Sequence, residues 1–362
     1  MTKTSSTPVK SASEGDAHPA ILVDLPRNPE RELVLEPIRA LLLDASSVLS
    51  IAHPFGDGDA LGSQLALHYF AQSLGKRSVM LNFDPLPATL RWPKGVSEMT
   101  DHLADDDQFD LIFLMETTEA SRMGDRTVFF KRARTAIHLD HHVDVKGLGD
   151  RNLLDPKASS VCELLFDLLA YTGHPLPADT IKALYIGIMT DTGNFRFPST
   201  TRRCHEIAGW MIDHGVEHAR LFKRVYEVNS YSRILLHGAV MSRAQRCHDG
   251  KIAHSSLALD DFARLGATPV DADGAVNQLV SIVGVEAAVL FREVEGGAVK
   301  ASFRSSGHVD VQEVAKKLGG GGHRLAASAT VPGPLIDSER QVLATLGEHV
   351  ARAFSGAEAC DA

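Results

Sequence analysis

The sequence predicts an α/β protein in which an N-terminal domain with a parallel sheet precedes a smaller C-terminal α/β domain, with a cleft between them. Three observations favour this architecture. The chain has 362 residues, 44% of them hydrophobic, which is enough for two domains with cores of their own. In the first half, short apolar segments alternate with segments of helical spacing, as they do in βαβ units. Near residue 215 this alternation gives way to a polar stretch with a helical pattern.

The predicted elements of the first half alternate between strand and helix. Residues 47–53 form the apolar run of a short buried strand. Residues 61–75 have apolar positions at helical spacing and end at Gly75, a frequent helix terminus. Residues 110–116 are apolar almost throughout, as expected of a strand covered on both faces. The remaining predictions are strands at residues 77–83 and 135–140 and helices at residues 159–171 and 179–188.

The second half has a different pattern, in which a polar helical stretch at residues 218–236 comes first. The predicted strands lie at residues 251–259, 286–294 and 299–304, and the predicted helices at residues 311–318 and 338–354. The first 31 residues are rich in Ser, Thr, Pro and Ala, which is typical of a disordered tail. The chain is therefore expected to comprise a tail at residues 1–31, an N-terminal domain at 32–217, a helical linker at 218–240 and a C-terminal domain at 241–356.

The composition excludes several classes of protein. With 37 basic and 46 acidic side chains the net charge is −9, which argues against a protein that coats long nucleic acid. No apolar run approaches the roughly 18 residues of a membrane span. The four cysteines are far apart, which favours free thiols in a reducing compartment over a disulfide framework or a zinc knuckle. Without a signal-peptide pattern, the expected location is the cytoplasm.

The strongest local motif follows the first predicted strand. His53, Asp57 and Asp59 place one imidazole and two carboxylates on a glycine-rich turn, a ligand set that suits divalent cations. The glycines beside Asp57 let the backbone turn sharply, so that both carboxylates can face one point. The alternative interpretation is a solvated turn, because Asp and Gly are common turn residues.

The ends of other predicted strands also carry acidic residues or histidines. Glu116 ends the third predicted strand, with Glu119 as a second candidate, and Asp140, His141 and His142 end the fourth. A further motif, Thr-Asp-Thr-Gly at residues 190–193, follows an apolar segment. Each of these motifs also has a simpler interpretation. The two glutamates could begin a helix, the two histidines could lie at the surface, and Thr-Asp-Thr-Gly could be an ordinary turn. Because parallel strands end at one edge of a sheet, the conjunction predicts one site with enough ligands for two divalent ions, manganese or magnesium rather than structural zinc.

These motifs, in this order, resemble the DHH phosphoesterase superfamily. The order is H-x-x-x-D-x-D, a strand-end acid, D-H-H and D-T-G. In the second half, VKASFRSS at residues 299–306 and GGGGHRLAAS at 319–328 resemble the DHH-associated C-terminal domain. The resemblance covers residues 32 to 355 and, within the superfamily, is nearest to the bifunctional oligoribonuclease and pAp phosphatase proteins. It implies a DHH domain at 32–217 and a substrate-binding domain at 241–356.

The resemblance also implies roles for individual residues. His53 and Asp57 would bind one ion, and Asp59, His141 and Asp191 the second. Glu116 would bridge both ions, at a position where the family usually has Asp. His142 would face the substrate phosphate, with Asp140 orienting its neighbours. The residues implied in substrate binding lie in the C-terminal domain: Arg304, Ser305, Gly320, Gly321, Gly322 and His323.

The function implied is that of a two-metal phosphoesterase. It would hydrolyse very short oligoribonucleotides to mononucleotides and remove the 3′-phosphate of pAp. One alternative is a phosphodiesterase for cyclic or linear dinucleotides of the c-di-AMP and pApA type. A second, suggested by Glu116, is a nucleotide-binding protein without catalysis. The expected partners are short RNA or a dinucleotide and pAp, with no membrane and no long nucleic acid, and a homodimer is left open.

Overall fold

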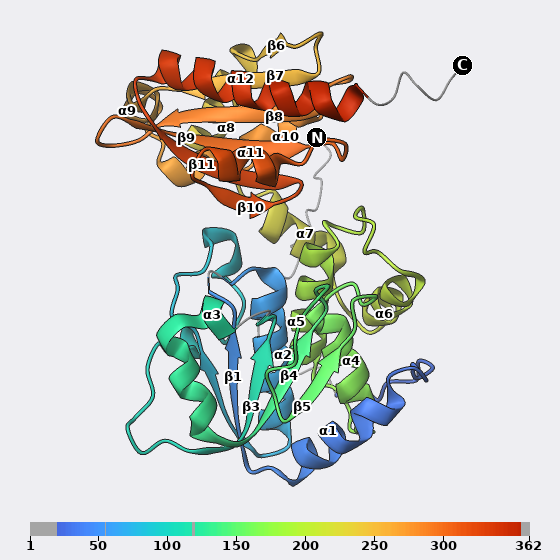
Figure 1. Ribbon diagram of the computed structural model, residues 1–362. Coiled ribbons are helices and arrows are strands. Elements are labelled where there is room, and N and C mark those ends of the chain that lie inside the picture. Colours follow the sequence, from blue (N-terminus) through green and yellow to red (C-terminus); the bar gives the residue numbers. More distant parts are fainter. Residues whose placement is uncertain (1–19, 55, 118–119, 356–362) are drawn as a thin grey trace, which may run out of the picture. The chain divides into compact units, whose positions relative to one another are not determined.

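The computed structural model describes residues 20–54, 56–117 and 120–355 of the chain (Figure 1). Glu119, the second candidate for the strand-end acid, lies outside these residues. The chain forms two compact units, Met1–Val228 and Asn229–Ala362, which confirms the predicted pair of α/β domains. The cleft between them stays a prediction. Within the described part of the chain, no helix combines the length and apolar character needed to cross a membrane.

The N-terminal unit contains a five-stranded sheet whose neighbouring strands are all parallel. Its order is β2-β1-β3-β4-β5, so all strands end at the same edge. The strands are β1 (Ser47–Ala52), β2 (Arg77–Leu81), β3 (Phe109–Met115), β4 (Ala133–Asp140) and β5 (Arg151–Leu154). Sequence reasoning did not predict β5, a strand too short to show a periodic pattern.

Helices cover both faces of this sheet. One face packs against α1, α2, α4 and α5, and the other against α3 and η3. The helical elements of this unit are α1 (Glu32–Asp44), α2 (Gly58–Ser73), η1 (Ala88–Leu90), η2 (Val96–Glu98), α3 (Ala120–Met123), η3 (Gly124–Arg132), α4 (Val161–Tyr171), α5 (Ala178–Asp191), α6 (Arg202–Asp213) and α7 (His218–Tyr226).

Glycines allow α2 and α5 to pack closely. A Cβ atom on Gly62 would lie 2.6 Å from the Ala183 carbonyl oxygen and 3.0 Å from the Gly187 nitrogen. A Cβ atom on Gly187 would lie 2.6 Å from Asp59 Oδ1. Only glycine fits these positions, and the resulting contact brings the N-terminus of α2 beside the C-terminus of α5.

The C-terminal unit contains a six-stranded sheet of order β10-β11-β9-β8-β7-β6, in which β7 and β8 are parallel and the other pairs antiparallel. On β9, Val299, Ala301 and Phe303 face the core, whereas the residues between them face away from it. The elements are α8 (Tyr231–Ser242), β6 (Gln245–Cys247), β7 (Ile252–Leu257), α9 (Leu259–Leu265), η4 (Pro269–Ala272), α10 (Ala275–Val280), β8 (Ala287–Glu293), β9 (Ala298–Ser305), α11 (Val311–Lys317), β10 (Gly321–His323), β11 (Ala326–Pro332) and α12 (Leu335–Phe354).

Two boundaries differ from the sequence expectation. The expected linker at 218–240 contains two helices, of which α7 packs into the first unit through Leu221 and α8 into the second through Leu236. The expected tail is ordered where the structure describes it. Ile21 pairs with Leu176, and Arg31 is buried against carboxylates of the N-terminal unit, so this polar segment belongs to that unit.

Candidate active site

The candidate site lies at the edge where the parallel strands end. His53 follows β1, Glu116 follows β3, and Asp140 is the last residue of β4. Two helix ends complete the site, because Asp59 lies in the first turn of α2 and Asp191 is the last residue of α5. The structure thus brings together side chains that are far apart in the sequence.

Three of these residues form a first group of ligand atoms. One atom each of His53, Asp57 and Glu116 lies within 4.8 Å of the others. His53 Nε2 is 3.5 Å from Glu116 Oε2 and 3.9 Å from Asp57 Oδ1. His53 Nδ1 contacts the Pro54 carbonyl oxygen at 2.7 Å, which leaves Nε2 for the site. Asp57 caps α2, because its Oδ1 accepts the backbone N–H groups of Asp59 and Ala60.

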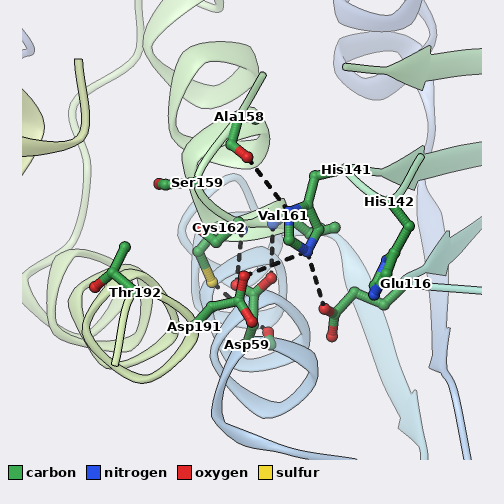
Figure 2. Close-up of polar contacts among 12 residues, drawn as sticks. Asp59, Glu116, His141, His142, Ala158, Ser159, Val161, Cys162, Asp191 and Thr192 are labelled. Atoms are coloured by element: carbon green, nitrogen blue, oxygen red, sulfur yellow. Dashed lines mark hydrogen bonds and ion pairs between the residues drawn. The ribbon is translucent and has the colours of Figure 1, made fainter. Parts of the chain in front are cut away.

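A second group consists of Asp59, His141 and Asp191, again with ligand atoms within 4.8 Å of one another. His141 Nε2 is 3.3 Å from Asp191 Oδ2. Figure 2 shows His141 between this pair of aspartates and Glu116. His141 Nε2 is 3.7 Å from Glu116 Oε1, so Glu116 contacts an imidazole of each group, one with each of its oxygens.

The donor atoms fit divalent cations. Glu116 Oε2 and His141 Nε2 are buried, and neither has a hydrogen-bond partner among the described residues. A buried polar atom left without a partner costs about 1–3 kcal/mol, which a bound cation would remove. The set consists of carboxylate oxygens and imidazole nitrogens without sulfur, the donors that suit manganese and magnesium.

The site concentrates negative charge in a buried volume. Burial raises the pKa of Asp59 well above its usual range, and the charges of Glu116 and Asp191 raise it further. Burial also raises the pKa of Asp191 to about 7. For His141, burial disfavours the charged imidazolium, but Glu116 and the aspartates outweigh it and raise the pKa to about 10. Without metal the site therefore retains protons that cations would displace.

His142 lies beside these groups and is oriented by Asp140. Asp140 Oδ1 accepts the backbone N–H of His142 at 2.9 Å and contacts its Nδ1 at 2.8 Å. Burial opposes ionisation of Asp140, but His138 and His142 outweigh it and hold its pKa well below the usual range. The His142 side chain is 45% exposed, so its other nitrogen, Nε2, is available to a ligand.

A pocket of about 310 Å³ lies in the C-terminal unit. Three of the expected substrate-binding residues, Arg304, Gly321 and Gly322, line it. The other three lie outside its lining: Ser305 at the end of β9, Gly320 before β10, and the exposed His323. Arg304 donates from Nε to Asn277 Oδ1 at 2.9 Å, which fixes its guanidinium on the pocket wall.

Sequence reasoning missed two further basic residues of this pocket, Arg292 and Lys300. Lys300 and Arg304 lie on the same face of β9 with Ser302 between them, so strand alternation could have found Lys300. Arg292 comes from β8, and it opposes Lys300 in the register of the two strands. Among the described lining residues, the acidic one is Asp273, which leaves the pocket with an excess of positive charge.

Comparisons with known proteins agree with both units. Residues 47–188 match the family model described as DHH family, N-terminal domain, and residues 249–352 match the DHHA1 domain. Over 323 residues the chain is 31% identical to a "Bifunctional oligoribonuclease and PAP phosphatase NrnA" of Thermus thermophilus, spanning 89% of this chain and 94% of that protein. The chain belongs to the DHH family. As a DHH-family protein it is a hydrolase that acts on phosphoesters.

Other relatives of this DHH protein show the range of the family. A "Cyclic-di-AMP phosphodiesterase GdpP" of Geobacillus thermodenitrificans is 24% identical over 84% of this chain, which spans 48% of that protein. Among solved structures, an exopolyphosphatase-related protein from Bacteroides fragilis has a TM-score of 0.81 at 24% identity, covering 89% of this chain and 98% of that one. The structural likeness shows that the fold is shared.

Proposed function

We propose that this DHH protein hydrolyses very short oligoribonucleotides to mononucleotides and removes the 3′-phosphate of pAp. The observation that carries the proposal is the pair of ligand groups joined by Glu116. The small basic pocket of the second unit supports a short anionic substrate, since 310 Å³ is at the lower end of the range for small-ligand sites. The relative at 31% identity, named for both activities, supports the same substrates.

In this proposal the two groups hold two divalent cations, manganese or magnesium. His53 and Asp57 would hold one and Asp59, His141 and Asp191 the other. Glu116, which lies near an imidazole of each group, would serve both. Two such cations supply charge neutralisation at the phosphoryl oxygens and an activated water molecule. Two of the residues that would hold the cations, Asp59 and Glu116, are buried and would shield them from bulk water.

His142 is proposed to face the phosphate and to protonate the leaving oxygen. Asp140 accepts the hydrogen bond from Nδ1, so the imidazole is held with Nε2 toward the substrate. His142→Asn is expected to lower kcat by about 10²–10⁴-fold, the usual contribution of general acid catalysis, with Mn²⁺ binding retained. Loss of Mn²⁺ binding in this variant would instead make His142 a ligand, a role that its proximity to Glu116 and His141 also allows.

A panel of substrates tests the proposed function. Purified protein with Mn²⁺ is given pAp, the dinucleotide pApA, a pentanucleotide, an RNA of about two dozen nucleotides and a cyclic dinucleotide, with Asp57→Ala/Asp59→Ala as the blank. Fast turnover of pAp and the dinucleotide, with the long and cyclic substrates spared, is the expected result. A preference for the cyclic dinucleotide would favour the second candidate, which the likeness to GdpP supports.

A further inference from the structure

Arg31 lies outside the residues that match the family model, yet it is among the most buried charged side chains of the N-terminal unit. It is 5% exposed and occupies the N-cap position of α1. Its guanidinium contacts three carboxylates: Asp155 at 2.7 Å, Glu163 at 2.9 Å and Asp167 at 2.6 Å. One planar cation with a fixed fork of donors thus joins acids from three positions of the chain.

Two of these acids delimit a segment that contacts the candidate metal ligands. Residues 155–163 connect β5 to the first turn of α4. In this segment the Ala158 carbonyl oxygen is 3.3 Å from His141 Nδ1. The backbone N–H groups of Val161 and Cys162 donate to Asp59 Oδ2 at 2.6 Å and to Oδ1 at 2.9 Å (Figure 2). The segment therefore orients two members of the second ligand group.

Arg31 is connected to those contacts through Glu163. Glu163 accepts from Arg31 with Oε1, and with Oε2 it accepts both the backbone N–H and the hydroxyl of Ser159, at 3.1 and 2.7 Å. Ser159 directly follows Ala158, whose carbonyl meets His141. At the other end, the Asp155 N–H donates to the Asp140 carbonyl oxygen and the Asp155 carbonyl accepts from Ala158. Both ends of the segment are thus fixed.

We propose that Arg31 is a positioning residue for the second ligand group, Asp59, His141 and Asp191. It holds residues 155–163 so that the Ala158 carbonyl and the Val161 and Cys162 amides orient His141 and Asp59 for the cation. The inference rests on the proposed function in taking this group as a cation site. The first group is oriented differently, because His53 and Asp57 are fixed by contacts at Pro54, Asp59 and Ala60. Arg31 therefore acts on one of the two sites.

The variant Arg31→Lys tests this inference. It keeps the positive charge but cannot reach three carboxylates with a planar fork. Arg31→Ala is a poorer choice, because it leaves buried carboxylates unpaired and is expected to unfold the chain. Glu163→Gln is a second variant, since it replaces the carboxylate that links Arg31 to Ser159. Arg203→Lys is the matched control, because Arg203 also pairs with Asp167, at 2.5 Å, but otherwise donates to the Pro26 carbonyl oxygen, away from residues 155–163.

The measurement is a titration of the metal-free full-length protein with Mn²⁺ alone, which is independent of turnover. Arg31→Lys and Glu163→Gln are expected to raise the Kd of one Mn²⁺ by about 10–100-fold, the usual effect of losing a residue that orients a ligand, and to leave the other Kd unchanged. Asp59→Asn identifies which binding step belongs to the second group. Arg203→Lys is expected to change neither step.

If Arg31→Lys bound both Mn²⁺ ions with the natural Kd values, the inference would be overturned. It would also be overturned if Arg203→Lys raised the Kd as much as Arg31→Lys does, because that would indicate a general effect on the fold. If the natural chain bound fewer than two Mn²⁺ ions, the proposed two-ion site would itself be wrong, and the role of Arg31 would fall with it. Two ions bound without hydrolysis of any substrate would contradict the proposed function but leave the role of Arg31 intact.

Discussion

At the scale of single residues, the backbone of Glu116 is the most unusual feature of the site. Its φ of +54° lies in the left-handed region, which costs a residue other than glycine about 1–3 kcal/mol. The sheet holds this conformation, since the Glu116 N–H donates to the Leu139 carbonyl oxygen of β4 at 3.0 Å. Directly after β3 the chain thus turns, and the Glu116 side chain reaches the imidazoles of both groups.

Replacing Glu116 by Gln tests this shared role. The change keeps the shape but removes the charge, so both groups lose a carboxylate at once. We expect at least one Mn²⁺ to be lost and kcat/KM for pAp to fall by about 100-fold or more, since effects of that order already follow loss of a residue that only orients a ligand. Glu116→Asp, which restores the carboxylate, is the control and should keep two ions. Two tightly bound ions in Glu116→Gln would contradict the shared role.

That the residues of this candidate site lie close together could largely be predicted from the sequence, whereas the burial of Arg31 beside three carboxylates could not. His53, Glu116 and Asp140 each follow or end an apolar strand, and parallel strands end at one edge, so their proximity follows from topology. Arg31 stands in a polar segment, and its partners Asp155 and Asp167 are 124 and 136 residues away. No periodic pattern connects residues at such separations.

At the scale of elements, the close contact of α2 and α5 determines whether the two aspartates meet. Gly187→Ala places a Cβ atom 2.2 Å from Cys162 Sγ and 2.6 Å from Asp59 Oδ1. We expect the free energy of unfolding to fall by about 1–3 kcal/mol, as for other overpacked cores, and Mn²⁺ affinity to fall with it. Denaturant unfolding and Mn²⁺ titration measure the two effects.

The control for this change is Gly209→Ala on α6, where a Cβ atom would meet no atom within 4 Å. Because alanine is the better helix former, this variant should raise the free energy of unfolding by up to about 1 kcal/mol. Equal destabilisation by both substitutions would contradict the close-packing argument.

The glycines at residues 320–322 illustrate what the sequence could not resolve at this scale. The resemblance implies substrate binding for all three, but it does not indicate that Gly321 and Gly322 lie on a short edge strand, β10. A Cβ atom on Gly320 would lie 2.1 Å from the Ser328 carbonyl oxygen, whereas one on Gly321 would meet no atom within 4 Å. The space available at each glycine depends on how β10 pairs with β11, and the sequence around the glycines does not reveal this pairing.

This difference in space around the two glycines predicts that one substitution affects activity and the other affects stability. Gly321→Val should leave stability unchanged and lower kcat/KM for pAp by about 10–200-fold, the usual effect of a misfit in a binding pocket, because the side chain enters the basic pocket. Gly320→Ala should lower thermal stability instead. An unchanged kcat/KM in Gly321→Val would show that this pocket does not bind the substrate.

At the scale of the whole molecule, charge is divided between the two units. The N-terminal unit gathers buried carboxylates at one sheet edge, and the C-terminal unit gathers Arg292, Lys300 and Arg304 around a pocket. A net charge of −9 therefore coexists with a local cluster of basic side chains. The sequence predicted the two domains from their different patterns, but it missed that residues before position 32 complete the first unit.

This division predicts that metal removal acts on one unit. Each cation that binds only the folded chain would stabilise it by about 2.7 kcal/mol at a free concentration of a hundred times its Kd. Hydrogen exchange with Mn²⁺ and with a chelator should differ around residues 53–60, 140–142 and 155–162. The strands of the C-terminal sheet should exchange equally in both conditions. Equal changes in both units would contradict this assignment.

The proposal of a metal site shared through Glu116 is tested most directly by anomalous diffraction from crystals of the full-length protein grown with Mn²⁺. We expect two anomalous peaks about 3.5–4 Å apart, one beside His53 and Asp57 and the other beside Asp59, His141 and Asp191, with Glu116 in contact with both. A single peak, or two peaks of which only one contacts Glu116, would contradict it.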